Sequence, residues 1–123
     1  MYNKISEWID AVLVEDIPSE VVAFCFNLYE ESDNTWSMEL VGAGRFDPED
    51  QDWACDEITD FDSRTNMFIW QADCEWYEAL ETMVTVLKQY LQKGKCADVL
   101  KSKFGVGVGF VDGDIEILYI KQL

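Results

Sequence analysis

The sequence predicts a single α+β domain over residues 1–123, with an antiparallel sheet of about five strands and one long and one or two short helices packed on one face. Three observations support this prediction. Helical periodicity is confined to a few stretches, strand-like segments occupy most of the remaining chain, and short turn signals join neighbouring strands. A chain of 123 residues is also long enough for one hydrophobic core but too short for two.

The first predicted element is a short amphipathic helix near the N-terminus. Its apolar residues fall at steps of three and four, which places them on one helical face. These residues are Ile5, Trp8, Ile9, Val12 and Leu13. The helix is expected to end before Asp16, because Pro18 and the residue preceding it interrupt helical structure.

Two strands joined by a turn follow this helix. Residues 21–30 are rich in β-branched and aromatic side chains and predict a central strand. Trp36, Met38 and Leu40 then alternate with polar residues, as in a strand with one buried face. The polar residues 31–34 between these segments predict the turn of a hairpin.

The middle of the chain is less regular. Residues 47–62 hold eight acids and have no clear period, so they predict a loop with a short strand around residues 53–58. The apolar residues 67–70 predict another short strand. Aromatic residues at strand or helix spacing are usually buried, and four of them in this region are therefore expected in the core. They are Phe68, Trp70, Trp76 and Tyr77.

The longest predicted helix begins near Trp76 and ends at Gly94. Its apolar residues recur at steps of three and four, and its acids come early and its lysines late, an order that complements the helix dipole. A short helical turn at residues 97–102 leads to two β-rich runs separated by Asp112 and Gly113. An Asp-Gly pair between such runs predicts a β-hairpin with a type I′ turn.

Charge is distributed very unevenly along the sequence. The chain has 25 Asp and Glu against nine Lys and Arg, a formal net charge of -16. Residues 1–81 hold 21 acids and three basic residues, whereas residues 82–123 hold four acids and six lysines. This balance argues against direct binding to nucleic acid or to anionic membranes, because both need a basic face. It favours a basic protein partner instead.

Cysteine and histidine usage argues against catalysis and metal binding. The four cysteines are widely spaced and the chain has no histidine, which excludes Ser-His and Cys-His nucleophilic arrangements and does not suggest a zinc site. We therefore expect no enzymatic activity, no cofactor and no metal ion. The N-terminal residues lack a signal-peptide pattern and no apolar run reaches the roughly 18 residues of a membrane span, so a cytoplasmic location is expected.

The acidic stretch 47–62 is the leading candidate for a functional site, as a solvated loop, a calcium site or a protein-binding surface. An EF-hand loop needs a glycine near its middle, which the residues after Asp47 lack. Carboxylates interleaved with aromatic residues combine electrostatic steering with anchors for the contact. Trp53 is the expected anchor. The candidate partner-binding residues are Asp47, Glu49, Asp50, Asp52, Trp53, Asp56, Glu57, Asp60 and Asp62.

Three alternating glycines, Gly105, Gly107 and Gly109, leave one face of a predicted strand without side chains. A dinucleotide-binding loop would place its glycines between a strand and a helix, which this pattern does not do. The bare face is expected to let the long helix or a bulky aromatic residue approach closely. A strand or loop of a partner settling on it is the alternative.

In size, acidity, tryptophan content, lack of targeting signals and the final hairpin FGVGVGFVDGDIEILYI, the chain resembles the small acidic α+β immunity proteins of bacteria. These proteins stay in the cytosol and neutralise polymorphic or contact-dependent toxins, many of which are basic nucleases. The resemblance implies a one-to-one complex in which the immunity protein covers or distorts the active site of the toxin. A carboxylate-rich loop fits this role, because it can occupy the positive groove of a nuclease.

Two other classes of function stay open at this point. The chain could be an acidic DNA mimic that inhibits or regulates a DNA-binding protein, although such proteins use carboxylates spaced along helices and these acids cluster in a predicted loop. It could also be a small-ligand or metal-binding domain with a pocket beside Gly105–Gly109.

Overall fold

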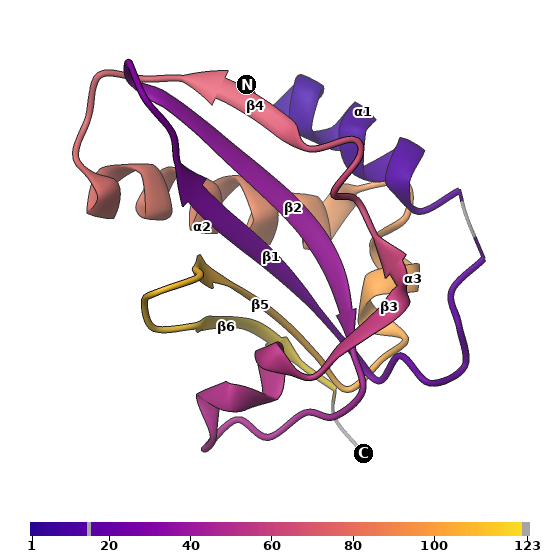
Figure 1. Ribbon diagram of the computed structural model, residues 1–123. Coiled ribbons are helices and arrows are strands. Elements are labelled where there is room, and N and C mark those ends of the chain that lie inside the picture. The colour runs from indigo at the N-terminus through magenta and orange to yellow at the C-terminus, as the bar shows by residue number, and fades with distance from the viewer. Residues whose placement is uncertain (15, 122–123) are drawn as a thin grey trace.

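Six strands form one sheet and three α-helices accompany it in the part of the chain that the structure describes (Figure 1). The structure, a computed structural model, describes residues 1–14 and 16–121, apart from the side chains of residues 59 and 60. The elements are α1 (Tyr2–Val12), β1 (Ala23–Glu30), β2 (Thr35–Ala43), the 3₁₀ helix η1 (Gln51–Cys55), β3 (Glu57–Asp62), β4 (Phe68–Gln71), α2 (Trp76–Lys93), α3 (Ala97–Lys101), β5 (Gly105–Phe110) and β6 (Glu116–Ile120).

The strand order is β3-β2-β1-β5-β6, and β4 pairs with β2 along the same edge as β3. The predicted central strand is therefore confirmed in β1. The predicted α+β class is confirmed. The sheet differs from the prediction in detail, because it has six strands in the described chain rather than about five and because β1 and β5 run parallel. The chain from β4 to β5 passes through α2 and α3, and a helical connection of this length can return a strand in the same direction as its neighbour.

The two predicted hairpins both form, and the first turn lies within the predicted residues 31–34. Between β1 and β2, Asp33 and Asn34 have φ values of 57° and 58°, and the positive sign at both central positions is the pattern of a type I′ turn. The prediction of a type I′ turn between β5 and β6 is wrong, because Gly113 does not have positive φ. Residues 111–115 form a longer loop there, in which the Gly113 N–H donates to the Phe110 carbonyl at 2.9 Å.

The irregular middle of the chain also differs in detail. The predicted short strand around residues 53–58 is displaced toward the C-terminus, since Trp53 lies in η1 and β3 begins at Glu57. Asp50 accounts for this difference, because its carboxylate accepts the Asp52 N–H at 3.1 Å and so caps a helical turn where a strand would otherwise start.

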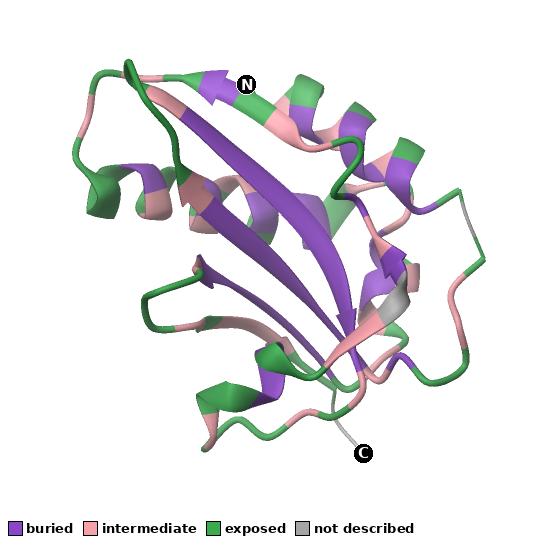
Figure 2. Ribbon diagram, in the orientation of Figure 1, coloured by how far each residue is buried: buried purple, intermediate pink, exposed green. Residues whose placement is uncertain are grey.

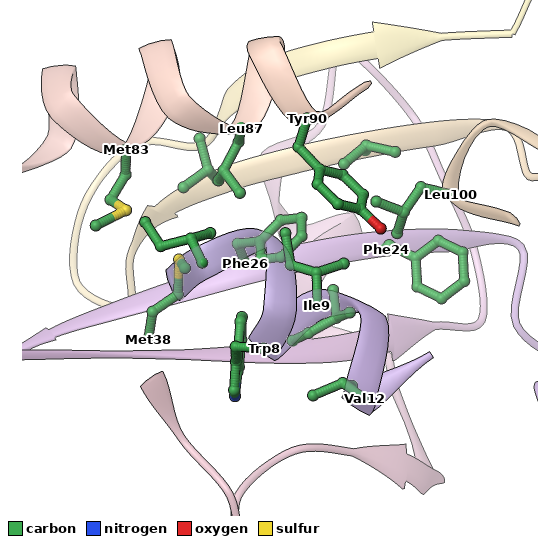
Figure 3. Packing of buried hydrophobic residues seen from close by; sticks show 14 of the residues in the cluster. Trp8, Ile9, Val12, Phe24, Phe26, Met38, Met83, Leu87, Tyr90 and Leu100 are labelled. Carbon is green, nitrogen blue, oxygen red and sulfur yellow. The ribbon is translucent and has the colours of Figure 1, made fainter. Parts of the chain in front are cut away.

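All three α-helices contribute to one hydrophobic core on one face of the sheet. Alternate residues of β1, β2 and β5 point into this core, among them Phe24, Phe26 and Val108. Figure 3 shows α1 and α2 side chains such as Ile9 and Leu87 converging on these strand residues. The apolar face of each amphipathic helix is thereby removed from water, which is the main stabilising contribution in a domain of this size.

Tyr90 of α2 is joined by hydrogen bonds to α1 and to the residues that follow α2. Its ring is fully buried, and its hydroxyl donates to Asp10 Oδ1 at 2.6 Å and accepts the Cys96 N–H at 2.9 Å. Gly94, which ends α2 as predicted, provides the space for the ring, because a Cβ at this position would overlap it. Burial, and then the bond to Asp10, raises the pKa of Tyr90.

We predict that Tyr90→Phe lowers the free energy of unfolding by about 1–3 kcal/mol, because Asp10 and the Cys96 N–H both lose their partner. Urea unfolding followed by circular dichroism measures the change. Tyr77→Phe is the matched control, since Tyr77 is 53% exposed and should tolerate the loss of its hydroxyl. Equal effects of the two substitutions would contradict this account of Tyr90.

Candidate protein-binding surface

The face of the sheet opposite the α-helices is partly covered by the acidic segment itself. Trp53 and Ala54 of η1, together with Phe46, form a second cluster with small residues of β1 and β2. Trp53 is 0% exposed. The predicted surface anchor is therefore buried, and its indole holds the acidic segment on the sheet. In Figure 2, η1 is mostly exposed ribbon with one buried stretch, and its buried residues are Trp53 and Ala54.

The glycines of β5 make this arrangement possible. A Cβ on Gly105 would overlap the Phe46 ring, and a Cβ on Gly107 would lie 3.0 Å from Trp53 and 2.8 Å from Ile115. Phe46 and Trp53 pack edge to face with ring centroids 4.9 Å apart. The expectation that a bulky aromatic residue approaches the bare strand is confirmed, whereas the long helix lies on the other face. The pocket suggested beside Gly105–Gly109 is filled by these side chains.

Several acids of the segment shape its backbone. Asp50, besides capping η1, forms an ion pair with Arg45 at 3.1 Å. The hydrogen bond from the Asp52 N–H and the bond from Arg45 lower the pKa of Asp50. Asp47 accepts the Glu49 N–H at 2.9 Å. These carboxylates contribute to the fold of the segment as well as to its charge.

A buried polar cluster, which the sequence analysis did not predict, lies beside the segment. The Glu39 carboxylate is 1% exposed and accepts from Asn27 Nδ2 at 3.1 Å, the Tyr29 hydroxyl at 2.6 Å and Arg64 Nε at 3.1 Å. Arg64 also forms an ion pair with Glu57 at 2.5 Å. This hydrogen-bonded contact contributes most to raising the pKa of Arg64. Burial, and then the bond to Glu39, raises the pKa of Tyr29.

The predicted site residues thus fall into two groups. Asp50, Glu57 and Asp62 take part in ion pairs or in the turn at Arg64, whose N–H donates to Asp62 at 3.0 Å. Exposed acids form the second group, and within the described chain none of them has a salt bridge. They are Asp47, Glu49, Asp52 and Asp56. The side chain of Asp60 lies outside the described residues.

The segment continues onto the β5–β6 hairpin. Gln51 Oε1 accepts the Ile115 N–H at 2.9 Å and joins η1 to the hairpin loop. Two hollows flank this loop, and Val111, Gly113 and Ile115 line both of them. The smaller hollow, about 210 Å³, lies on the side of η1, and the larger groove, about 710 Å³, lies on the side of α2.

The two hollows together are lined by carboxylates from four parts of the chain. Asp52 and Glu57 line the smaller one, and the described lining of neither contains Lys or Arg. Four acids line the larger groove: Glu30, Asp112, Asp114 and Glu116. The acidic surface therefore extends beyond residues 47–62 to the end of β1 and the hairpin.

Sequence reasoning missed these additional residues for identifiable reasons. The charges of residues 82–123 nearly cancel, and this near-neutral total conceals three acids within the five positions 112–116. Counting charge over shorter stretches of sequence would have found them. Trp76 and Tyr77, expected in the core with Phe68 and Trp70, are 54% and 53% exposed. They occupy the first turn of α2, whose buried residues begin only at Ala79, so helical spacing alone overstated their burial.

The described residues give no support for thiol chemistry, a metal site or a membrane-spanning helix. Burial raises the pKa of the Cys25 thiol to about 12, so the thiol stays protonated and inert near neutral pH. Within the described residues no three Cys, Asp or Glu side chains come together as a metal site. None of the described helices has the length and apolar character that crossing a bilayer requires.

Comparison of the chain with protein-family models, with curated proteins and with solved structures finds no match in any of the three.

We predict that Gly105→Ala lowers the free energy of unfolding by about 1–3 kcal/mol, because the new methyl group would displace Phe46 from the sheet. Gly113→Ala is the matched control. Its Cβ would lie 3.7 Å from the nearest atoms, and the expected change is below about 0.5 kcal/mol. Urea unfolding of both variants measures the difference. Similar stability of the two variants would refute the role assigned to the bare face of β5.

We also predict that Cys25 makes the protein less stable at alkaline pH. The unfolded thiol ionises near pH 9.0 and the folded thiol near 12, so rising pH favours the unfolded chain within that window. The free energy of unfolding should fall more steeply for the wild type than for Cys25→Ala, by at most about 1.4 kcal/mol per pH unit. Urea midpoints from pH 8 upward measure it, and Cys55→Ala, an exposed thiol, should follow the wild type. Parallel profiles for all three proteins would refute the prediction.

Proposed function

We propose that this chain is a cytoplasmic immunity protein that binds and neutralises a cognate basic toxin, such as a nuclease domain, and has no enzymatic activity of its own. One observation carries the proposal: among the described residues, six carboxylates and no Lys or Arg line the two adjoining hollows beside the β5–β6 hairpin. Of the exposed acids in residues 47–56, Asp52 lines the smaller hollow.

Electrostatics supports a basic partner. Arg45 and Arg64, two of the three basic residues in the first 81, are engaged by Asp50, Glu39 and Glu57, so they add no free positive charge to this face. A surface of one sign raises the association rate of an oppositely charged partner by about 10–1,000-fold at low ionic strength. Fast association suits an inhibitor of a lethal enzyme. A nuclease offers the complementary surface, because it must attract nucleic acid phosphates.

The packing of the acidic segment supports the proposal independently. A flexible acidic loop would lose conformational entropy on binding, and this loss would weaken the complex. Here Trp53 and Phe46 hold the segment on the sheet, and the bond between Gln51 and Ile115 joins it to the hairpin. The carboxylates are therefore positioned before the partner arrives.

The structure refines the choice of residues for a test. Reversing Asp50 or Glu57 would break an ion pair within the fold, so loss of binding would be ambiguous. Asp52, Asp112 and Asp114 are exposed, line the hollows and form no salt bridge within the described chain. Their reversal to Lys changes the surface with the least effect on the fold.

We predict that the triple variant Asp52→Lys, Asp112→Lys, Asp114→Lys associates with the toxin at least about tenfold more slowly and shows a weaker salt dependence. The probe is the product of the gene that neighbours the gene of this chain. Stopped-flow association at about 0.01 M and 0.15 M ionic strength measures the rate, and survival on co-expression measures protection.

The matched control reverses Glu7, Asp16 and Glu20, which are exposed, line neither hollow and change the net charge equally. This control should keep the association rate within about threefold of the wild type, because those charges lie away from the contact. An unchanged rate in the first variant, or the same loss in both, would show that the proposed surface does not bind the partner.

A further inference from the structure

The larger groove has an aromatic wall that charge steering does not require. It lies between the first turn of α2 and the loop of the β5–β6 hairpin, which Figure 1 shows on the same side of the molecule. Leu28, Leu80 and Phe110 form its base, and Trp76 and Val111, which are 54% and 52% exposed, form its sides. Exposed aromatic surface beside an apolar base is characteristic of binding sites.

Trp76 is held in place by contacts that continue into the core. Its ring packs edge to face on Phe110 with centroids 6.2 Å apart, and Phe110 packs in the same way on buried Trp36 at 5.9 Å. Trp76 is also the first residue of α2, whose start is fixed by the capping box of Glu75 and Glu78. The indole is therefore a preorganised platform, which lowers the entropic cost of a contact made on it.

The charges around this platform all have the same sign. Asp112, Asp114 and Glu116 come from the hairpin and Glu30 comes from the end of β1. The described lining contains no cation. Lys88 and Lys93 belong to the opposite end of α2, and Lys101 to α3. An occupant of this groove must therefore supply positive charge together with apolar surface.

We propose, on the basis of the proposed function, that this groove docks an arginine-bearing apolar segment of the basic partner. The guanidinium group meets the hairpin carboxylates, and a neighbouring apolar side chain lies on Trp76 and Phe110. Arg fits better than Lys, because its planar group stacks on an aromatic face and pairs with a carboxylate through two hydrogen bonds. A volume of about 710 Å³ accommodates several side chains, which favours a segment over a single residue.

A second copy of this chain is a less suitable occupant. Two molecules with a formal net charge of -16 each repel one another, and the self-association would have to overcome this repulsion. A cationic segment of another protein has no such cost. The experiment nevertheless includes self-association as an outcome.

The test uses the full chain and short capped peptides as probes. One peptide alternates Arg with Leu, and three matched peptides replace Arg by Lys, Arg by Glu, or Leu by Ser. Titration calorimetry at physiological ionic strength measures their affinities. The Arg-Leu peptide should bind one to one and more tightly than the Lys-Leu peptide, whereas the Glu-Leu and Arg-Ser peptides should bind at least about tenfold more weakly.

Substitutions locate the binding site. Trp76→Ala and the pair Asp112→Asn, Asp114→Asn should each weaken binding of the Arg-Leu peptide about tenfold. Phe104→Ala is the matched control, because Phe104 is an aromatic residue that is 48% exposed and does not line the groove, and it should change affinity less than about twofold. Thermal unfolding checks that the exposed Trp76 can be replaced without loss of the fold.

Three outcomes would overturn the proposal. Equal binding of the Arg-Ser and Arg-Leu peptides would reduce the interaction to charge alone, and equal effects of Trp76→Ala and Phe104→Ala would place it elsewhere. Self-association of the wild type in sedimentation experiments, abolished by Trp76→Ala, would assign the groove to a second copy. Failure of the proposed function is distinguishable from these, because it appears as absence of toxin binding while the peptide results stand.

Discussion

The packing of Phe46 and Trp53 against the glycines of β5 is the contact on which the opposite face of the sheet depends. Consecutive residues of β1 and β2 are buried, so both faces of the sheet are covered there, and the α-helices cover only one of them. Because Gly105 and Gly107 have no side chains, two large aromatic rings fit close to the backbone. A short irregular segment therefore covers this face of the sheet, as the α-helices cover the other face. The acids carried by that segment are displayed at the surface because its aromatic residues point inward.

In this arrangement, acids that repel one another lie next to the ion pairs and hydrogen bonds that offset the repulsion. Like charges crowded on one face repel and lower the stability of the folded state. The fold offsets this locally: Arg64 binds Glu39 and Glu57, Arg45 binds Asp50, and backbone N–H groups bind Asp47 and Asp62. Five acids that form no salt bridge within the described chain line the hairpin hollows, where a ligand of opposite charge gains from them. They are Glu30, Asp52, Asp112, Asp114 and Glu116.

Local signals predicted the elements that local interactions determine. The periodicity and charge order of α2 predicted it through to Gly94, and the polar turn before Thr35 predicted the first hairpin. Three features depend on contacts distant in sequence and could not be predicted in this way: the parallel pairing of β1 with β5, the burial of Trp53 and the exposure of Trp76. The acidic segment was recognised from composition, but its continuation onto Asp112 and Asp114 needed the spatial neighbourhood that Gln51 creates.

The parallel pairing of β1 with β5 has a consequence for the order in which the molecule assembles. The two strands are separated by all the residues of β2, η1, β3, β4 and both later helices, so their pairing closes a long loop and is slow compared with hairpin formation. The docking position of Trp53 is completed only when this loop closes, because Gly107 belongs to β5. The acidic surface is therefore a late product of folding: an emerging or partly folded chain carries its charges but not yet the ordered surface that displays them.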